Sequence, residues 1–91
     1  MVDYKLLIAL AAVIEHAGFE RAASHLGLSQ SAVSQRIKLL EARLGTAVLV
    51  RSAPPQPTAA GQRLLNHVQQ VRLLERDLQA DLPQMADAAG R

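Results

Sequence analysis

Residues 29–38 combine hydroxyl, amide and cationic side chains, which are the types that bind nucleic acid. Amides can hydrogen-bond a base edge in two places, and hydroxyls and cations bind phosphate oxygens. At about 100° per residue, six of these side chains fall on one side of a helix. Ser31, Gln35 and Lys38 lie at its centre, Gln30 and Ser34 on one flank and Arg36 on the other. Amides and hydroxyls at the N-terminal end, with cations further along, suit a helix in a DNA major groove.

The opposite side of the same segment is apolar and predicts how the helix packs. Val33, Ile37, Leu40 and Leu44 stand at i, i+4, i+7 and i+11, a narrow stripe at the helical period. Gly45 follows and is a residue type that ends helices. We therefore expect a helix from about residue 30 to residue 44, with the stripe toward the core and the polar side free.

A shorter helix and a tight turn precede this segment. Residues 20–26 are rich in Ala and predict a helix, and Gly27 can adopt a positive φ at little cost. Leu28 is expected to fill the turn. Ser29 is a good N-cap, because its hydroxyl can accept a backbone N–H bond in the first turn of the next helix. The two helices together predict a helix-turn-helix.

The composition indicates a small helical domain. The 91 residues make one domain, and 49% of them are apolar but only 2% aromatic, so Leu, Ile, Val and Ala must build the core. The sequence has no Cys, which suits a reducing compartment, and we expect a cytoplasmic protein. The apolar run 6–14 is too short to cross a bilayer, and no cleavage-site pattern follows it. We therefore expect no signal peptide and no membrane partner.

The positive charge is concentrated in the proposed helix-turn-helix. The net charge of +2 divides into −1 for residues 1–19, +3 for residues 20–51 and 0 for residues 52–91. The cations of the central segment are Arg21, Arg36, Lys38, Arg43 and Arg51, against Glu20 and Glu41. This surplus suits a surface that faces phosphates. On charge alone, a solvated helix face with some Arg explains it equally well.

The N-terminal segment 3–16 predicts a helix with a wide apolar surface. Leu6, Leu10 and Val13 lie along one side, with Leu7, Ala11 and Ile14 beside them. Such a helix packs between two neighbours or contributes one side to an interface. We expect Gly18 to end it at the position after the C-cap and Phe19 to pin it to the helix-turn-helix.

After Gly45 the pattern predicts a small wing. Residues 47–51 are short, aliphatic and β-branched, which indicates a strand, and Ser52-Ala53-Pro54-Pro55 indicates a turn. Residues 56–58 are expected to return as a second short strand, at an exposed edge because of Pro57. Arg51 is the only cation of this wing, which would lie over the phosphate backbone.

The C-terminal segment predicts one long helix, residues 59–82, capped by Thr58 and ended by Leu82-Pro83. Its apolar residues step by fours and threes, roughly as in a heptad seam. The seam residues are Leu64, Val68, Val71, Leu74, Leu78 and Leu82. A helix about 36 Å long exceeds what so small a domain can cover, so we expect its free half to pair with a second copy. Residues 83–91 are expected to form a hinge or tail.

These residues resemble the N-terminal DNA-binding region of LysR-type transcriptional regulators. The matching stretches are FERAASHLGLSQSAVSQRIKLLEARLG, a short hydrophobic strand that ends in Arg, and PTAAGQRLL at the start of the long helix. The expected fold is mainly α, with a winged helix-turn-helix (residues 1–58) followed by a linker or dimerisation helix (residues 59–82). The resemblance implies bacterial transcription regulation through sequence-specific binding to double-stranded DNA, by a homodimer or tetramer.

Several features resemble one subgroup, the ArgP/LysG-like regulators of basic amino-acid (lysine or arginine) export and metabolism. They are the residue Ser31, where the family usually has Pro, the wing sequence 50–58 and the helix ending 12–15. The resemblance also implies an effector domain of periplasmic-binding-protein type beyond the hinge, through which a small-molecule effector such as lysine or arginine would act. That domain is absent from these residues, so we expect the chain to be part of a longer regulator.

The resemblance assigns DNA contacts to nearly the same positions as the helix pattern. They are Ser29, Gln30, Ser31, Ser34, Gln35 and Arg36 of the second helix, and Arg51 of the wing. We expect Gln30 and Gln35 to bind bases, because an amide can bond adenine in two places. We expect Ser29, Arg36, Lys38 and Arg51 to contact phosphates, which fix the register and carry little sequence information.

One alternative function remains open from the sequence. A helical protein-interaction module, with the long helix as a coiled coil and no DNA specificity, would use the same elements. An enzyme is not indicated, because the sequence has no paired nucleophile and base, no Gly-rich phosphate loop and no carboxylate dyad. No cofactor is expected. His16, His25 and His67 lack Cys or paired carboxylates at ligand spacing, so we expect no metal site.

Overall fold

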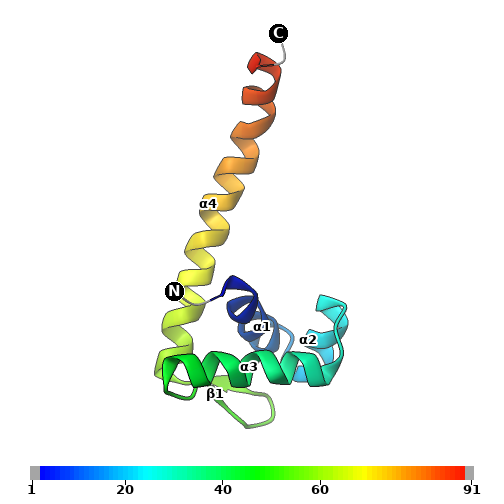
Figure 1. Ribbon diagram of the computed structural model, residues 1–91, viewed down its shortest axis with the longest axis vertical. Coiled ribbons are helices and arrows are strands. Elements are labelled where there is room, and N and C mark those ends of the chain that lie inside the picture. Colours follow the sequence, from blue (N-terminus) through cyan, green and yellow to red (C-terminus); the bar gives the residue numbers. More distant parts are fainter. Residues whose placement is uncertain (1–2, 90–91) are drawn as a thin grey trace.

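The computed structural model describes residues 3–89, which form helices and one small hairpin (Figure 1). The elements are α1 (Tyr4–Glu15), α2 (Phe19–Leu26), α3 (Gln30–Leu44), β1 (Leu49–Val50), β2 (Gln56–Pro57) and α4 (Ala59–Ala89). The molecule measures 54 × 25 × 19 Å, because α4 rises away from a compact body made of the other elements. The mainly α winged helix-turn-helix with a long following helix is confirmed. Residues 1–2 of the predicted first domain and 90–91 of the predicted tail lie outside the described residues.

α1 is the central helix of the core. Its N-cap Asp3 accepts a hydrogen bond from the backbone N–H of Lys5 at 3.0 Å. The helix packs against α2, α3 and α4, and its wide apolar surface is buried among them. The buried side chains are Leu6, Leu7, Ala9, Leu10, Ala11, Ala12 and Val13. Of the two expected arrangements, packing between neighbours is the one observed.

The left-handed residue after α1 is Ala17, so the prediction that Gly18 takes this position is wrong. The φ of Ala17 is 58°, whereas Gly18 has an extended φ of 162° and caps α2. The N–H of Gly18 bonds to the carbonyl of Val13 at 3.1 Å, and that of Ala17 to Ile14 at 3.3 Å, which closes the helix in a Schellman motif. The helix ends one residue earlier than predicted, so the left-handed position falls one residue earlier too.

The apolar stripe of α3 is buried as predicted. Val33, Ile37 and Leu40 are 0% exposed, and Leu44 is partly buried against the core. The helix packs on α1 and α2. Gly45 ends it with a φ of 71°. We call Val33, Ile37 and Leu40 the apolar row.

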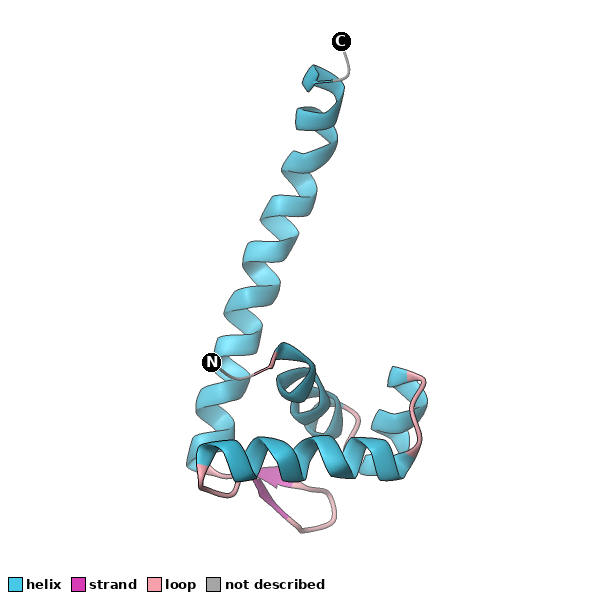
Figure 2. Cartoon of the chain, in the orientation of Figure 1, coloured by secondary structure: helices cyan, strands magenta, loops and turns pink. Residues whose placement is uncertain are grey.

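The wing is a hairpin whose strands are shorter than predicted (Figure 2). Leu49 pairs with Pro57, and Val50 with Gln56, in antiparallel register. Residues 47–48, predicted as strand, lead into β1 as irregular backbone, and Val48 is buried in the core. The predicted turn occupies residues 52–55.

Thr58 joins the wing to α4. Its hydroxyl accepts a hydrogen bond from the N–H of Gly61 at 3.1 Å, which confirms the N-cap. The same hydroxyl donates to the carbonyl of Ala47 at 2.7 Å. Gly61 lies directly against the chain that leads into β1: a Cβ at this position would be 2.1 Å from the carbonyl oxygen of Val48. The first turn of α4 therefore docks on the wing through backbone contacts.

α4 continues to Ala89 with Pro83 inside it, so the predicted end at Leu82 is wrong. A proline removes one N–H and leaves the carbonyl of the preceding turn without its helical partner. Residues 73–84 are exposed, so water can reach that carbonyl. The avoidance of helical backbone before proline is a bias and not an obligatory stop. Residues 83–89 of the predicted hinge or tail are therefore helical.

The predicted seam of α4 has two different environments. Val68 is 1% exposed and belongs to the core of its own chain, so its prediction as a dimerisation residue is wrong: it packs against α1 and is covered. Leu64 is partly buried against the same core, and Val71 is half-buried. Leu74, Leu78 and Leu82 are 68%, 55% and 46% exposed. The sequence period alone could not tell the half that packs on α1 from the half that is free.

The close approach at Gly61 leads to a stability prediction. Gly61→Ala should destabilise the chain by about 1–3 kcal/mol, because its Cβ would press on the backbone of Val48. The measurement is urea unfolding followed by helical circular dichroism. Gly18→Ala is the matched control, since an added Cβ there meets nothing within 4 Å. Equal stability of the two variants would contradict the docking of α4 on the wing.

Candidate nucleic-acid interface

The polar side of α3 is exposed, as the sequence predicted. α3 crosses the lower part of the compact body, beside the hairpin (Figure 1). Gln30, Ser31, Gln35 and Lys38 are exposed. We call these four exposed side chains the polar face of α3. The face is held outward because the apolar row lies on the opposite side of the same helix.

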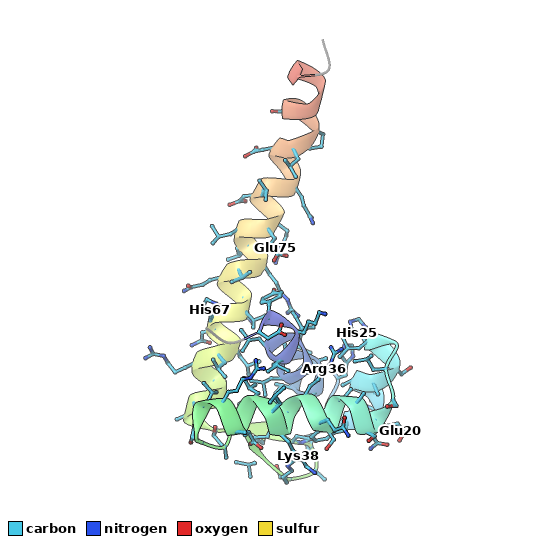
Figure 3. All side chains as sticks on the ribbon, viewed as in Figure 1. Glu20, His25, Arg36, Lys38, His67 and Glu75 are labelled. Carbon is cyan, nitrogen blue, oxygen red and sulfur yellow. The ribbon has the colours of Figure 1, made fainter. Side chains whose placement is uncertain are left out.

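Two predicted contact residues, Ser34 and Arg36, are half-buried at the edges of this face. Figure 3 shows Lys38 on the side of α3 toward the hairpin and Arg36 on the other side, toward α1. Arg36 therefore lies beside the face, whereas Lys38 belongs to it and points toward the hairpin. A helix in a major groove needs such an arrangement, with amides at the base edges and cations at the phosphates on either side.

Ser29 supports α3 directly. Its hydroxyl oxygen accepts a hydrogen bond from the N–H of Ala32 at 3.1 Å, which satisfies one of the free donors of the first turn. Its backbone is extended, with φ −73° and ψ 155°, and Gly27 takes the turn at φ 68°. The first turn of α3 forms regularly with Ser31 in the position where the family usually has Pro. Ser29 remains exposed, so its hydroxyl proton is still free to donate outward.

A cleft of about 640 Å³ separates the tip of the wing from the helix-turn-helix. Its lining comes from the loop before α2, from α2, from the start of α3 and from the wing tip. The lining residues are Ala17, Gly18, Phe19, Glu20, Arg21, Gln30, Ser52, Ala53, Pro54 and Pro55. The cleft thus lies between the two elements that are expected to flank a nucleic-acid backbone.

Arg51 is the side chain that ties the wing to the helix-turn-helix. Its guanidinium carbon lies 5.0 Å from the centroid of the Phe19 ring, at the start of α2. One of its terminal nitrogens is 4.0 Å from a carboxylate oxygen of Glu41 on α3. The side chain of Arg51 is still 49% exposed. Phe19, which was expected to pin the first helix, therefore also supports the cation of the wing.

Sequence reasoning missed two side chains at this surface. Arg21 lines the cleft with Gln30, although the sequence counted it only as part of the net charge. Leu39 is 44% exposed and stands one turn after Gln35 on α3. Its distance from the buried stripe on the helical wheel could have shown this, because it lies about 100° from Leu40 on the side away from Val33.

The remaining titratable side chains form no second site among the described residues. His16 and His25, which the sequence treated as scattered, have ring centroids 4.2 Å apart. No group of three or more potential metal ligands gathers within the described part of the chain. Arg72 on α4 bonds to Glu15 on α1 at 2.8 Å, on the exposed surface. None of the helices in residues 3–89 has the length and apolarity that crossing a membrane requires.

The sequence matches the family model of the bacterial regulatory helix-turn-helix proteins of the lysR family over residues 4–62. This match spans the helices, the wing and the start of α4, so the chain belongs to the lysR family. It is a LysR-type helix-turn-helix DNA-binding domain, and the alternative of an interaction module without DNA specificity is set aside. The chain is 77% identical over 83 residues to the transcriptional regulator ArgP of Pseudomonas fluorescens, which covers 91% of this chain and 28% of that protein.

Comparison of the fold with solved structures supports the same family assignment. Full-length LTTR LysG from Corynebacterium glutamicum with bound effector Arg matches with a TM-score of 0.88 and 33% identity, over 94% of this chain and 30% of that one. The BenM_DBD/catB site 1 DNA complex matches with a TM-score of 0.77 and 29% identity, over 98% of this chain and 95% of that one. The chain thus spans less than a third of the full-length relatives and nearly all of a DNA-binding domain in complex with DNA.

The capping role of Ser29 can be tested through the stability of the chain. Ser29→Ala should lower the free energy of unfolding by about 1 kcal/mol, because α3 loses its N-cap. Ser29→Asp is the matched variant: its carboxylate caps equally well and leaves stability near that of the wild type. Urea unfolding measures both variants. A Ser29→Ala variant as stable as Ser29→Asp would mean that the bond to Ala32 contributes nothing.

Proposed function

We propose that the chain binds double-stranded DNA sequence-specifically, with α3 in the major groove, as the N-terminal part of a transcriptional regulator. The observation that carries the proposal is the geometry of α3. Gln35 is exposed while the apolar row behind it is fully buried. α3 therefore has one orientation on the body, and that orientation presents amides and hydroxyls outward.

The contact residues divide by chemistry. We assign Gln30 and Gln35 to base edges, because their amides donate and accept at once. We assign Ser31 and Ser34 to the same stretch of groove. Phosphate contacts fall to four residues around the edge of the site: Ser29, Arg36, Lys38 and Arg51. Ser29, Lys38 and Arg51 are exposed, which supports this division, and Arg36 is half-buried at the edge of the polar face.

Selection of bound duplexes from a random pool tests the proposal. The chain should enrich one sequence pattern, and its affinity for the selected duplex should fall steeply with salt through counterion release. Equal retention of all sequences would contradict specific binding. Absence of binding at low salt would contradict the proposal altogether.

Gln35→Ala should weaken binding to the selected duplex by roughly 1–3 kcal/mol and relax the preference at one base pair. The reason is that one bidentate amide contact is lost while the fold is unchanged. Fluorescence anisotropy with single-base variants of the duplex measures both effects. Gln70→Ala, an exposed glutamine on α4, is the control and should bind as the wild type does. A preference unchanged in Gln35→Ala would remove Gln35 as a base contact.

We further propose that the chain acts as a homodimer through the free half of α4. Leu74, Leu78 and Leu82 are large, apolar and exposed, and they lie within about 80° of one another on the helix. Water contact with three leucines on one side of a helix is unfavourable, and a second copy of α4 would cover them. Leu64 and Val71 extend the same side toward the body and are partly covered within the chain.

Leu78→Asp should convert dimers to monomers, because it puts a charge into the apolar contact. Leu73→Asp is a close control, since both leucines are 55% exposed but Leu73 lies about 140° around the helix from Leu78. Sedimentation at several protein concentrations measures the association. Intact dimers in Leu78→Asp, or monomers in both variants, would place the interface elsewhere.

The relatives suggest a signal for the whole regulator. We propose that it responds to lysine or arginine through a domain outside these residues and controls basic amino-acid export or metabolism, in the cytoplasm, as a dimer or tetramer. The identity to ArgP and the likeness to LysG with bound effector Arg support this assignment. We assign the chain a binding role and no catalytic one.

A further inference from the structure

Three elements meet at the guanidinium of Arg51. The wing supplies Arg51, directly after β1. Helix α2 supplies the ring of Phe19 at 5.0 Å, and α3 supplies the carboxylate of Glu41 at 4.0 Å. Arg51 is the only cation of the wing. Whatever restrains this guanidinium therefore controls the charge that the wing offers to a phosphate.

The two oxygens of Glu41 have different tasks. One accepts a hydrogen bond from the backbone N–H of Val48 at 2.9 Å, in a partly buried position. This bond joins α3 to the chain that leads into β1. The other oxygen faces Arg51. The side chain of Glu41 is only 24% exposed and its carboxylate is held by Val48, whereas the side chain of Arg51 is 49% exposed and has more room to move.

We propose that Glu41 is a positioning residue that holds Arg51 in the free protein and gives it up to a backbone phosphate when a duplex binds. Glu41 thereby lowers the affinity of the wing for every duplex, whatever its sequence. This inference rests on the proposed function, because it assigns a further residue to the same DNA-binding surface.

The geometry favours an exchange over a permanent pair. A separation of 4.0 Å with the Arg51 side chain 49% exposed makes a weak, solvent-screened pair. A phosphate can accept two N–H bonds from one guanidinium, which is the stronger arrangement. Phe19 needs no rearrangement, since the face of its ring supports the cation before and after the exchange.

The sign of the effect follows from the charge that is left behind. When Arg51 moves to a phosphate, Glu41 loses its counter-charge and attracts a cation from solution. That uptake offsets one cation released from the DNA, so it lowers both the affinity and its dependence on salt. Removing the charge of Glu41 while keeping its oxygen acceptor for Val48 should therefore strengthen binding.

Glu41→Gln is the variant that makes this change. It should bind a duplex selected from a random pool, and a scrambled duplex of the same composition, about threefold more tightly, with a salt slope steeper by up to about one. The same substitution in an Arg51→Met chain should change affinity by less than about 1.5-fold, since the partner is gone. Arg51→Met keeps an apolar stem beside Phe19.

Each outcome of these measurements either supports or overturns the exchange of Arg51 from Glu41 to a phosphate. Unchanged or weaker binding by Glu41→Gln, or an equal gain in the Arg51→Met background, would overturn the exchange while leaving DNA binding intact. No duplex binding by the wild-type chain would overturn the proposed function as well. A measurement on the wild type covers the case in which Glu41→Gln fails to fold. The carboxyl ¹³C resonance of Glu41 should shift when duplex is added, and an unmoved resonance would contradict the exchange.

Discussion

The burial of the apolar row of α3 against α1 is the interaction on which the rest of the structure depends. Val33, Ile37 and Leu40 are 0% exposed, as are Leu10 and Val13 of α1. Each such side chain contributes about 1.5–3 kcal/mol when fully buried. Rotating α3 about its own axis by one residue, about 100°, would expose part of this row and turn part of the polar face toward the core. The direction of Gln35 is therefore fixed by the residues behind it.

A second constraint fixes the wing relative to α3. Glu41 bonds to the N–H of Val48 at 2.9 Å, Thr58 donates to the carbonyl of Ala47 at 2.7 Å, and Gly61 lets α4 approach Val48 without a Cβ. The two short strands alone form too little ladder to be stable. The wing therefore keeps its place through contacts with α3 and α4, and these same contacts bring Arg51 beside Phe19.

Local chemistry made much of the fold predictable. Ser29 and Thr58 have side chains that cap helices, Gly27 and Gly45 can take a positive φ, and the stripe of α3 follows the helical period, so each of these predictions needed only nearby residues. The errors came where the answer depends on distant residues or solvent. Pro83 does not stop α4, because water can reach the freed backbone, and Val68 is covered by α1, which a heptad period cannot reveal.

The residues of the candidate site also differ in whether nearby sequence alone predicts their environment. The exposure of Gln30, Ser31, Gln35 and Lys38 could be predicted from the helical wheel. The contacts of Arg51 could not, because Phe19, Glu41 and Arg51 come from separate elements and only the folded chain brings them together. The left-handed residue is Ala17 and not Gly18 because α1 ends one residue earlier than predicted. Differences of one or two residues are common at helix ends.

The central claim is that the polar face of α3 meets the base edges of a duplex. A titration of the ¹⁵N-labelled chain with a selected duplex, followed through side-chain amide resonances, tests it most directly. We expect the amide resonances of Gln30 and Gln35 to shift strongly, while that of Gln70 on α4 should not shift. Shifts confined to α4, with Gln30 and Gln35 unmoved, would contradict it.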